Sequence, residues 1–341
     1  MIKMKKMAAG LLTAVMLTVL CAASAAALEL VPVGRAVGIE MNTDGVLVVG
    51  LAQVEAEGGA RSPAGDAGVL PGDRIVRLGA REIKNGEDFL AAVAALDGNR
   101  VSLTVRRGEK AIQFDLTPAQ SPAGAWQLGL WLRDSVAGIG TVTFYDPTSG
   151  LYGALGHGIC DMETGVLLPV SEGSITEAQV VDVRPGAKGT PGELCGAPNS
   201  EQTLGDIGQN TIFGIFGQGK DALAARAALP VAAERELVLG PATILSTVSG
   251  SEVQEFAVEI TRVYRGDDSG RCLMVTVTDP ALIRATGGIV QGMSGSPILQ
   301  NGKLVGAVTH VLVNDPTRGY GISAERMLKA AGVDAAGEKA A

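Results

Sequence analysis

The chain has 341 residues, a length typical of about two domains, and it is 46% hydrophobic and 19% charged with a formal net charge of −8. This composition is apolar enough for a packed core and excludes a disordered chain. The acidic balance, with no dense basic block after residue 6, argues against nucleic acid as a partner. The 47 glycines favour tight turns between short strands over long helices.

The first residues have the three parts of an export signal. MIKMKK supplies a positive segment, Ala8–Leu20 is apolar, and Ala23, Ser24 and Ala25 form a small-residue cleavage site. We therefore expect residues 1–27 to be a signal peptide and the protein to be exported. The alternative is an N-terminal membrane anchor, because the stretch from Ala8 to Leu30 is nearly long enough to span a bilayer.

The cysteines give little guidance. Four are present, at Cys21, Cys160, Cys195 and Cys272, and their spacing excludes a zinc knuckle. A lipoprotein interpretation of Cys21 is disfavoured because Leu20 before it is large. One disulfide could form in an oxidising compartment, but the spacing does not choose the pair, and buried free thiols explain the residues equally well.

Residues 35–118 have the pattern of a small domain with short strands and one helix. GVLVVGLA (Gly45–Ala52) is predicted to be a buried strand, and Leu70-Pro71-Gly72-Asp73 a turn before a second strand. The segment Asn85–Leu96 places its apolar residues on one helical face. Two further strands are expected around a turn at Arg107-Gly108-Glu109.

This segment resembles a PDZ domain of the bacterial, protease-associated kind. The signature is SPA-x-x-AG-V-L-x-PGD-x-I, which here runs from Ser62 to Ile75. The resemblance implies that Val37, Gly38 and Ile39 form the loop that binds a peptide carboxylate, while the peptide C-terminus adds a strand to the sheet edge. The alternative is a PDZ domain that only packs on its neighbour.

The rest of the chain is predicted to be mostly β. Residues 119–125 (AQSPAGA) have the composition of a linker, and strand-like runs fill most of residues 126–333. Two helices are expected there, Lys220–Leu229 and Ala324–Ala331. Many short strands with glycine turns favour a barrel or a sandwich. The expected fold class is thus mainly β with few helices, a PDZ domain followed by a β-rich domain.

QGMSGSPI, residues 291–298, is the best candidate for a nucleophile turn. Glycines allow a sharp turn, so the N–H groups of Gly292 and Ser294 can point at one spot and form an oxyanion hole. The pattern is similar to the G-D-S-G-G-P of trypsin-like proteases, which puts Ser294 at the nucleophile position. Ser296 is the alternative nucleophile and fits better as a turn hydroxyl.

A serine nucleophile needs a base, and the chain has only two histidines, His157 and His310. His157 lies between two glycines, where its ring can be exposed on a turn. His310 lies in an alternating strand, where a half-buried structural role is the simpler interpretation. The orienting carboxylate stays open between Asp279, Asp161 and Asp315, because sequence spacing does not report proximity in the fold.

Two blocks carry a second resemblance. Trp131–Gly165 and Thr278–Ile322 are similar to the stage IV sporulation protein B peptidase family (SpoIVB), and the similarity extends over the PDZ segment and the N-terminal apolar stretch. It implies a barrel-like serine peptidase related to the trypsin-like enzymes, with His157 as base, Asp279 as orienting carboxylate and Ser294 as nucleophile. Asp279 lies too close to Ser294 in sequence for an ordinary double barrel.

The resemblance also implies a function. Such proteins are secreted serine endopeptidases. They cleave themselves near the N-terminus, here within residues 28–35 or in the tail of the signal, and they cleave a membrane-embedded regulator in the space around the forespore. This cleavage starts the processing of the mother-cell sigma factor. A PDZ-based scaffold with an inactive protease domain is the alternative. No cofactor or metal is expected, and the absence of HExxH speaks against a metalloprotease.

Overall fold

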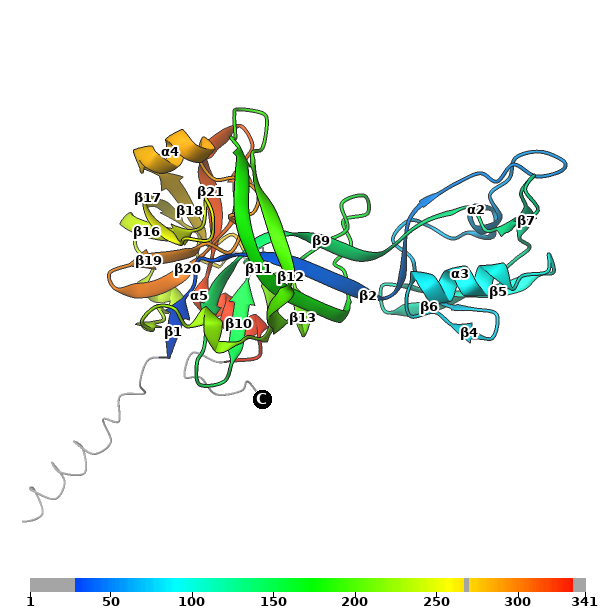
Figure 1. Ribbon diagram of the computed structural model, residues 1–341, viewed down its shortest axis with the longest axis horizontal. Coiled ribbons are helices and arrows are strands. Elements are labelled where there is room, and N and C mark those ends of the chain that lie inside the picture. Colours follow the sequence, from blue (N-terminus) through cyan, green and yellow to red (C-terminus); the bar gives the residue numbers. More distant parts are fainter. Residues whose placement is uncertain (1–27, 267–269, 334–341) are drawn as a thin grey trace, which may run out of the picture.

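The structure is a computed structural model that describes residues 28–266 and 270–333. Its buried apolar residues form three clusters, which define three lobes. Two lobes lie against each other, and the third stands apart at the end of two long strands, β2 (Ala36–Leu51) and β9 (Leu130–Tyr145) (Figure 1). The mainly β fold class predicted from the sequence is confirmed. The expected signal peptide or anchor, residues 1–27, lies outside the described residues.

The N-terminal lobe is an open antiparallel sheet, a half-barrel, in the order β13-β14-β10-β9-β2-β11-β12. It contains the first half of β2, the second half of β9, and the strands β1 (Glu29–Pro32), β10 (Leu151–Ala154), β11 (Val170–Arg184), β12 (Glu193–Asp206), β13 (Gln209–Thr211), β14 (Gly214–Gln218) and β15 (Leu229–Pro230). Tyr145, Tyr152 and Ile175 are buried in its core. The first half of β2 pairs with β9 on one side and β11 on the other, so it is an interior strand of this lobe.

The C-terminal lobe is a closed six-stranded barrel. Its strands follow the order β16 (Gly240–Ser246), β17 (Gln254–Val263), β18 (Leu273–Val277), β21 (Asp315–Ser323), β20 (Lys303–Leu312) and β19 (Pro297–Gln300). Strict alternation in β17 turns Phe256, Val258 and Ile260 inward. Two short helices, α4 (Pro280–Thr286) and α5 (Ala324–Ala330), follow β18 and β21. The barrel core continues into the N-terminal lobe through Phe144 and Phe216, which joins the two lobes.

The third lobe has the pattern expected for the PDZ segment. It comprises the second half of β2, the start of β9, and α2 (Pro63–Ala67), β3 (Arg74–Leu78), β4 (Arg81–Glu82), α3 (Gly86–Ala94), β5 (Val101–Arg107), β6 (Lys110–Leu116), β7 (Ala119–Gln120) and β8 (Trp126–Gln127). The predicted helix and hairpin correspond to α3, capped by Asn85, and to β5–β6. The Pro-Gly-Asp turn is fixed by buried Asp73, whose carboxylate accepts hydrogen bonds from the Arg107 guanidinium at 2.6 and 2.8 Å.

Two long strands extend through more than one lobe: β2 lies within the predicted PDZ segment, residues 35–118, and β9 within the predicted peptidase segment, residues 126–333. Residues 36–42 of β2 pair with β9 and β11 in the N-terminal lobe, and the supposed linker 119–125 closes a small hairpin between β7 and β8. The PDZ lobe therefore begins inside β2 and ends inside β9, because both strands run through two lobes. The helix predicted at Lys220–Leu229 is wrong: only a short 3₁₀ turn forms, at Asp221–Leu223. The helix predicted at Ala324–Ala331 corresponds to α5.

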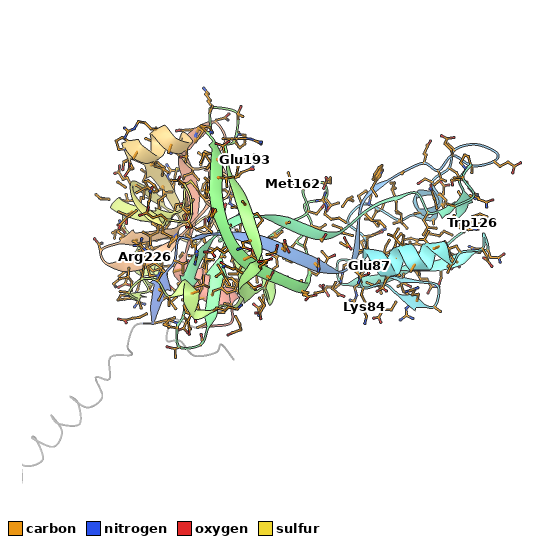
Figure 2. All side chains as sticks on the ribbon, viewed as in Figure 1. Lys84, Glu87, Trp126, Met162, Glu193 and Arg226 are labelled. Atoms are coloured by element: carbon orange, nitrogen blue, oxygen red, sulfur yellow. The ribbon has the colours of Figure 1, made fainter. Side chains whose placement is uncertain are left out.

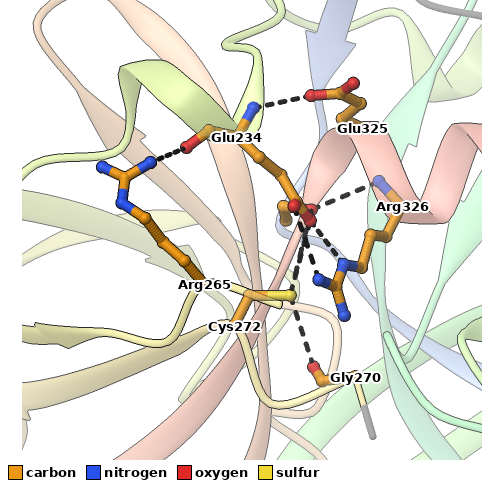
Figure 3. A network of polar contacts seen from close by, with 7 residues as sticks. Glu234, Arg265, Gly270, Cys272, Glu325 and Arg326 are labelled. Atoms are coloured by element: carbon orange, nitrogen blue, oxygen red, sulfur yellow. Dashed lines mark hydrogen bonds and ion pairs between the residues drawn. The ribbon is translucent and has the colours of Figure 1, made fainter. Parts of the chain in front are cut away.

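A polar network joins the 3₁₀ turn Glu234–Glu236 to the end of β21 and to α5 (Figure 3). The Glu234 carboxylate, on the 3₁₀ turn Glu234–Glu236, accepts hydrogen bonds from Ser323 Oγ at 2.6 Å and from the Arg326 guanidinium. Burial raises the pKa of Glu234, but these hydrogen bonds outweigh it, so the net pKa is lowered. Cys272 Sγ lies 3.7 Å from the same carboxylate. Within the described residues, Cys160, Cys195 and Cys272 are all free thiols.

Candidate functional site

The turn Gly292–Ser296 lies where the barrel meets the N-terminal lobe. Gly292 and Gly295 have φ of +93° and +97°, so the sharp turn predicted from the glycines is present. Two threonines of β9 hold it. Thr141 Oγ1 donates to the Gly292 carbonyl at 2.7 Å, and Thr143 Oγ1 donates to the Gly295 carbonyl at 2.8 Å. The turn is thus fixed from the opposite lobe, by a long-range contact that no local sequence pattern predicts.

The two serines of the turn have different surroundings. Ser294 is half-buried, and its Oγ donates to the Thr309 carbonyl at 2.6 Å. Ser296 is fully buried and its Oγ bonds to Ser246 Oγ at 3.1 Å. A substrate carbonyl can approach Ser294 but has no access to Ser296, which agrees with the predicted turn role for Ser296.

The backbone N–H groups expected to form an oxyanion hole are free. Among the described residues, neither the N–H of Gly292 nor that of Ser294 donates a hydrogen bond within the chain, whereas those of Met293, Gly295 and Ser296 all do. Unpaired N–H groups on a tight turn are the arrangement that stabilises a developing oxyanion.

His157 is placed by an unusual backbone turn at the end of β10. Leu155 and Gly156 both have positive φ, 68° and 70°, and Leu155 is one of only two such non-glycine residues in the described chain. This turn brings the imidazole to the lobe boundary, where a Cβ on Gly156 would lie 2.9 Å from Thr309 Cγ2. His157 Nδ1 lies 2.9 Å from the Gly158 carbonyl, so Nδ1 carries the proton and Nε2 is left as an acceptor.

His310 lies beside His157, and this proximity was not predicted from the sequence. The two ring centroids are 4.8 Å apart. Burial lowers the pKa of His157, with a smaller opposing effect of the Gly158 carbonyl. Partial burial, then the neighbouring His157 and Arg271, lower the pKa of His310 to about 4, although the residue as a whole is exposed. Both imidazoles are therefore neutral near pH 7, and a neutral imidazole is the form that accepts a proton.

Ser294, His157 and His310 share one cavity of about 480 Å³ between the two lobes. Its other lining residues are mostly aliphatic, and Gly292 forms part of its wall. Met162, on a loop that projects between the barrel and the PDZ lobe, stands at its rim (Figure 2). The structure thus brings together two of the three predicted catalytic residues and the oxyanion turn.

Asp279 is not among the residues that line this cavity. Its carboxylate is the N-cap of α4 and accepts from the N–H groups of Ala281 at 2.8 Å, Leu282 at 3.4 Å and Ala257 at 3.2 Å. The structure therefore does not bring Asp279 to His157, and the contact that fixes the imidazole tautomer comes from Gly158. The short sequence separation from Ser294 does not translate into proximity to the base.

The other two carboxylates also have partners of their own. Asp161 is buried, pairs with Arg133 Nη1 at 2.7 Å and accepts from Thr164. Asp315 accepts from Thr317 Oγ1 at 2.6 Å. Within the described part of the chain no carboxylate is hydrogen-bonded to His157, and no group of three or more His, Cys, Asp or Glu side chains is placed to hold a metal ion.

The predicted carboxylate loop of the PDZ domain is wrong. Val37, Gly38 and Ile39 lie inside β2, where they pair with residues 138–140 of β9 and with residues 175–177 of β11. Both edges are occupied and the side chains of Val37 and Ile39 are buried, so no peptide strand can be added there. The sequence suggested this loop because its order of apolar residues and glycine resembles that of a PDZ carboxylate-binding loop. In the structure the segment belongs to the N-terminal lobe instead.

A hollow of about 270 Å³ lies instead between α3 and the β8–β9 connection. Phe89 and Val93 of α3 face the segment Gln127–Leu130 across it. The N–H groups of Leu128 and Gly129 make no hydrogen bond among the described residues, and Gly129 has a φ of +74°. The order Leu-Gly-Leu at residues 128–130 was the signal that could have located this loop in the sequence.

Comparison with known families agrees with this geometry. The family model of the SpoIVB peptidase S55 matches residues 124–328, and a PDZ domain model matches residues 36–117. The chain belongs to the SpoIVB peptidase S55 family. It is a PDZ-containing serine peptidase, as the sequence resemblance implied.

More distant similarities are also present. A putative zinc metalloprotease of Clostridium perfringens is 29% identical over 69 residues, which cover 20% of this chain and only 21% of that protein. The structure of the active form of the protease Rv3671c from Mycobacterium tuberculosis superimposes on 57% of this chain, using 72% of its own chain. The sequence identity is 16% and the TM-score is 0.33. The PDZ domain of an SdrC-like protein from Listeria monocytogenes covers 26% and 87%, at 24% identity and a TM-score of 0.22. These values are too low to carry an inference about chemistry.

Proposed function

We propose that this peptidase is exported and acts in endospore formation, in the space between the two membranes around the forespore. Its proposed substrates are a membrane-embedded regulatory protein, whose cleavage starts the processing of the mother-cell sigma factor, and its own segment at residues 28–35. Family membership and the N-terminal export pattern support this assignment. Residues 1–27 serve as signal peptide or anchor; within residues 28–266 and 270–333 no helix is long and apolar enough to cross a bilayer.

The catalytic mechanism that we propose uses Ser294 and His157. Ser294 Oγ transfers its proton to His157 Nε2 and bonds to the substrate carbonyl carbon, while the N–H groups of Gly292 and Ser294 stabilise the oxyanion. The C–N bond then breaks, and the amine leaves with the proton from His157. Water, activated by the same imidazole, hydrolyses the acyl-enzyme. The observation that carries the proposal is that these residues line one cavity, with the oxyanion donors free.

Ser294 has to turn before it reacts. Its Oγ donates to the Thr309 carbonyl, which accepts a hydrogen bond but is too weak a base to take the proton. A rotation about χ1 toward His157 therefore precedes proton transfer. Gly158 takes the place of an orienting carboxylate, because its carbonyl holds the Nδ1 proton and leaves Nε2 free. Asp279, which the family resemblance implied as the third member, is proposed here to act on the stability of α4 instead.

The PDZ lobe supports peptide binding. We place the peptide C-terminus at the N–H groups of Leu128 and Gly129, with its side chains in the hollow against α3. This lobe then selects the substrate or holds it near the peptidase lobes. Substituting Gly129 with Val should weaken binding of C-terminal peptides and leave the reactivity of Ser294 unchanged; binding that survives Gly129→Val would place the site elsewhere.

The role in sporulation is tested in an endospore former that lacks its own member of the family. We expect the wild type to restore sigma-factor processing and Ser294→Ala to fail, while Ser296→Ala, the matched neighbouring change, restores it. Mass spectrometry of the purified wild type and Ser294→Ala reports self-cleavage in the same proteins. Restoration by Ser294→Ala would show that the chain acts as a scaffold and not through proteolysis.

A further inference from the structure

The cavity at Ser294 has a mostly aliphatic wall, and beside the two histidines and Ser294 its polar side chains are the uncharged Gln291 and Thr309. Ile139 and Leu155 of the N-terminal lobe face Ile289, Val290, Val311 and Val313 of the barrel. Leu155, Ile289 and Val290 are no more than 5% exposed, so they form a fixed apolar surface that does not depend on mobile side chains. The wall comes from both lobes and is as well defined as the turn that carries the nucleophile.

Among the described residues, the two histidines are the only ionisable side chains that line this cavity, and no Asp, Glu, Lys or Arg is part of the lining. A charged group entering the cavity would lose hydration without gaining an Asp, Glu, Lys or Arg side chain of opposite charge, which is costly. An apolar group entering it would gain about 25 cal/mol for each Å² removed from water. At the rim, Met162 and Val313 are 92% and 44% exposed, which is apolar surface that a bound substrate would cover.

We propose that this cavity binds the P1 side chain, the one before the scissile bond, and selects an uncharged apolar residue such as Leu, Val, Met or Phe. This inference rests on the proposed function, in which Ser294 is the nucleophile. The scissile carbonyl oxygen lies at the N–H groups of Gly292 and Ser294, so the side chain of the same residue enters the space beside them. Gly292 forms one wall of that space.

The test uses peptidyl diphenyl phosphonates that differ only in the P1 side chain: Leu, Val, Phe, Lys or Glu. Each reagent phosphonylates the nucleophile, in that Oγ bonds to phosphorus, a P–O bond breaks and phenol leaves. We expect the Leu, Val and Phe reagents to react with the full chain about 100-fold faster than the Lys and Glu reagents, because pocket complementarity and charge burial both act on this step. A faster reaction of the Lys or Glu reagent overturns the proposal.

A small fluorophosphonate without a P1 side chain separates this inference from the proposed function. No reaction with any reagent overturns the proposed function, and the inference with it. Reaction with the fluorophosphonate, but without preference for apolar P1 groups, overturns the inference alone.

Val313→Asp tests the pocket assignment by placing a negative charge in the lining of the cavity. Val238→Asp is the control, because Val238 does not line the cavity and the two valines are similarly exposed, at 47% for Val238 and 44% for Val313. Val313→Asp is expected to raise the Lys-to-Leu rate ratio about two- to fivefold, the size of a surface ion pair. Val238→Asp should leave the ratio unchanged. An equal effect of both variants, or none from Val313→Asp, contradicts the assignment of the P1 pocket.

Discussion

Gly156→Ala tests whether the lobe boundary sets the position of the base. Gly156 has a φ of +70°, and an added Cβ would lie 2.9 Å from Thr309 Cγ2 and 3.0 Å from Ile322 Cγ2. Non-bonded carbons prefer about 3.5–4.0 Å, so the loop that carries His157 must move by about 0.6 Å or more. A displacement of this size at a catalytic group lowers the rate by up to about 100-fold. The positive φ adds about 1–2 kcal/mol of backbone strain.

Gly165→Ala is the matched control, because Gly165 has a φ of +69° and nothing within 4 Å of the added Cβ. In urea unfolding, both variants should lose the stability that the positive φ costs, and Gly156→Ala should lose more because its added Cβ also clashes. Only Gly156→Ala should slow labelling by a fluorophosphonate, measured as a second-order rate constant on folded protein. Wild-type labelling in Gly156→Ala, or an equal loss in Gly165→Ala, would refute the idea that contact across the lobes positions His157.

Three more predictions concern the same site. Asp279→Ala should lower the free energy of unfolding by about 1 kcal/mol, because α4 loses its N-cap. Asp279→Asn retains the cap and should leave the free energy of unfolding unchanged. Loss of fluorophosphonate labelling in both variants would instead show that Asp279 acts on His157. Because burial lowers the pKa of His157 below its usual 6.5, the neutral base persists as the pH falls, and the pH profile of labelling should have its apparent pKa below 6.5; a value of 7 or above contradicts this. Thr141→Val leaves the Gly292 carbonyl without its hydroxyl donor and should slow labelling, whereas Thr141→Ser, which keeps the donor, should label at the wild-type rate. Equal labelling rates in the two variants would show that this hydrogen bond does not position the turn for reaction.

Local features of the sequence predicted much of this protein. Glycines around Ser294 predicted the turn, the flanking glycines singled out His157, and the Pro-Gly-Asp signature located the PDZ lobe. Each of these depends on residues close together in the chain. Asn85 and the apolar face after it likewise predicted α3, since capping and helical periodicity are local properties.

Features that depend on distant pairings were missed. The segment at residues 37–39 resembles a PDZ loop, but its strand is completed by β11, more than 130 residues later, and no local pattern encodes that register. Thr141 and His310 reach the site because the two lobes meet there. Asp279 appeared as a triad member by position, yet its local role as a helix N-cap before Pro280 was also readable from the sequence.

We propose that Ser294 and His157 act as one catalytic unit across the lobe boundary. The most direct test is to react the wild type, Ser294→Ala, Ser296→Ala and His157→Ala with a fluorophosphonate and to map the label by mass spectrometry. We expect label on Ser294 in the wild type and in Ser296→Ala, and none in Ser294→Ala or His157→Ala when both are folded. Label on Ser296, or full labelling of His157→Ala, would contradict it.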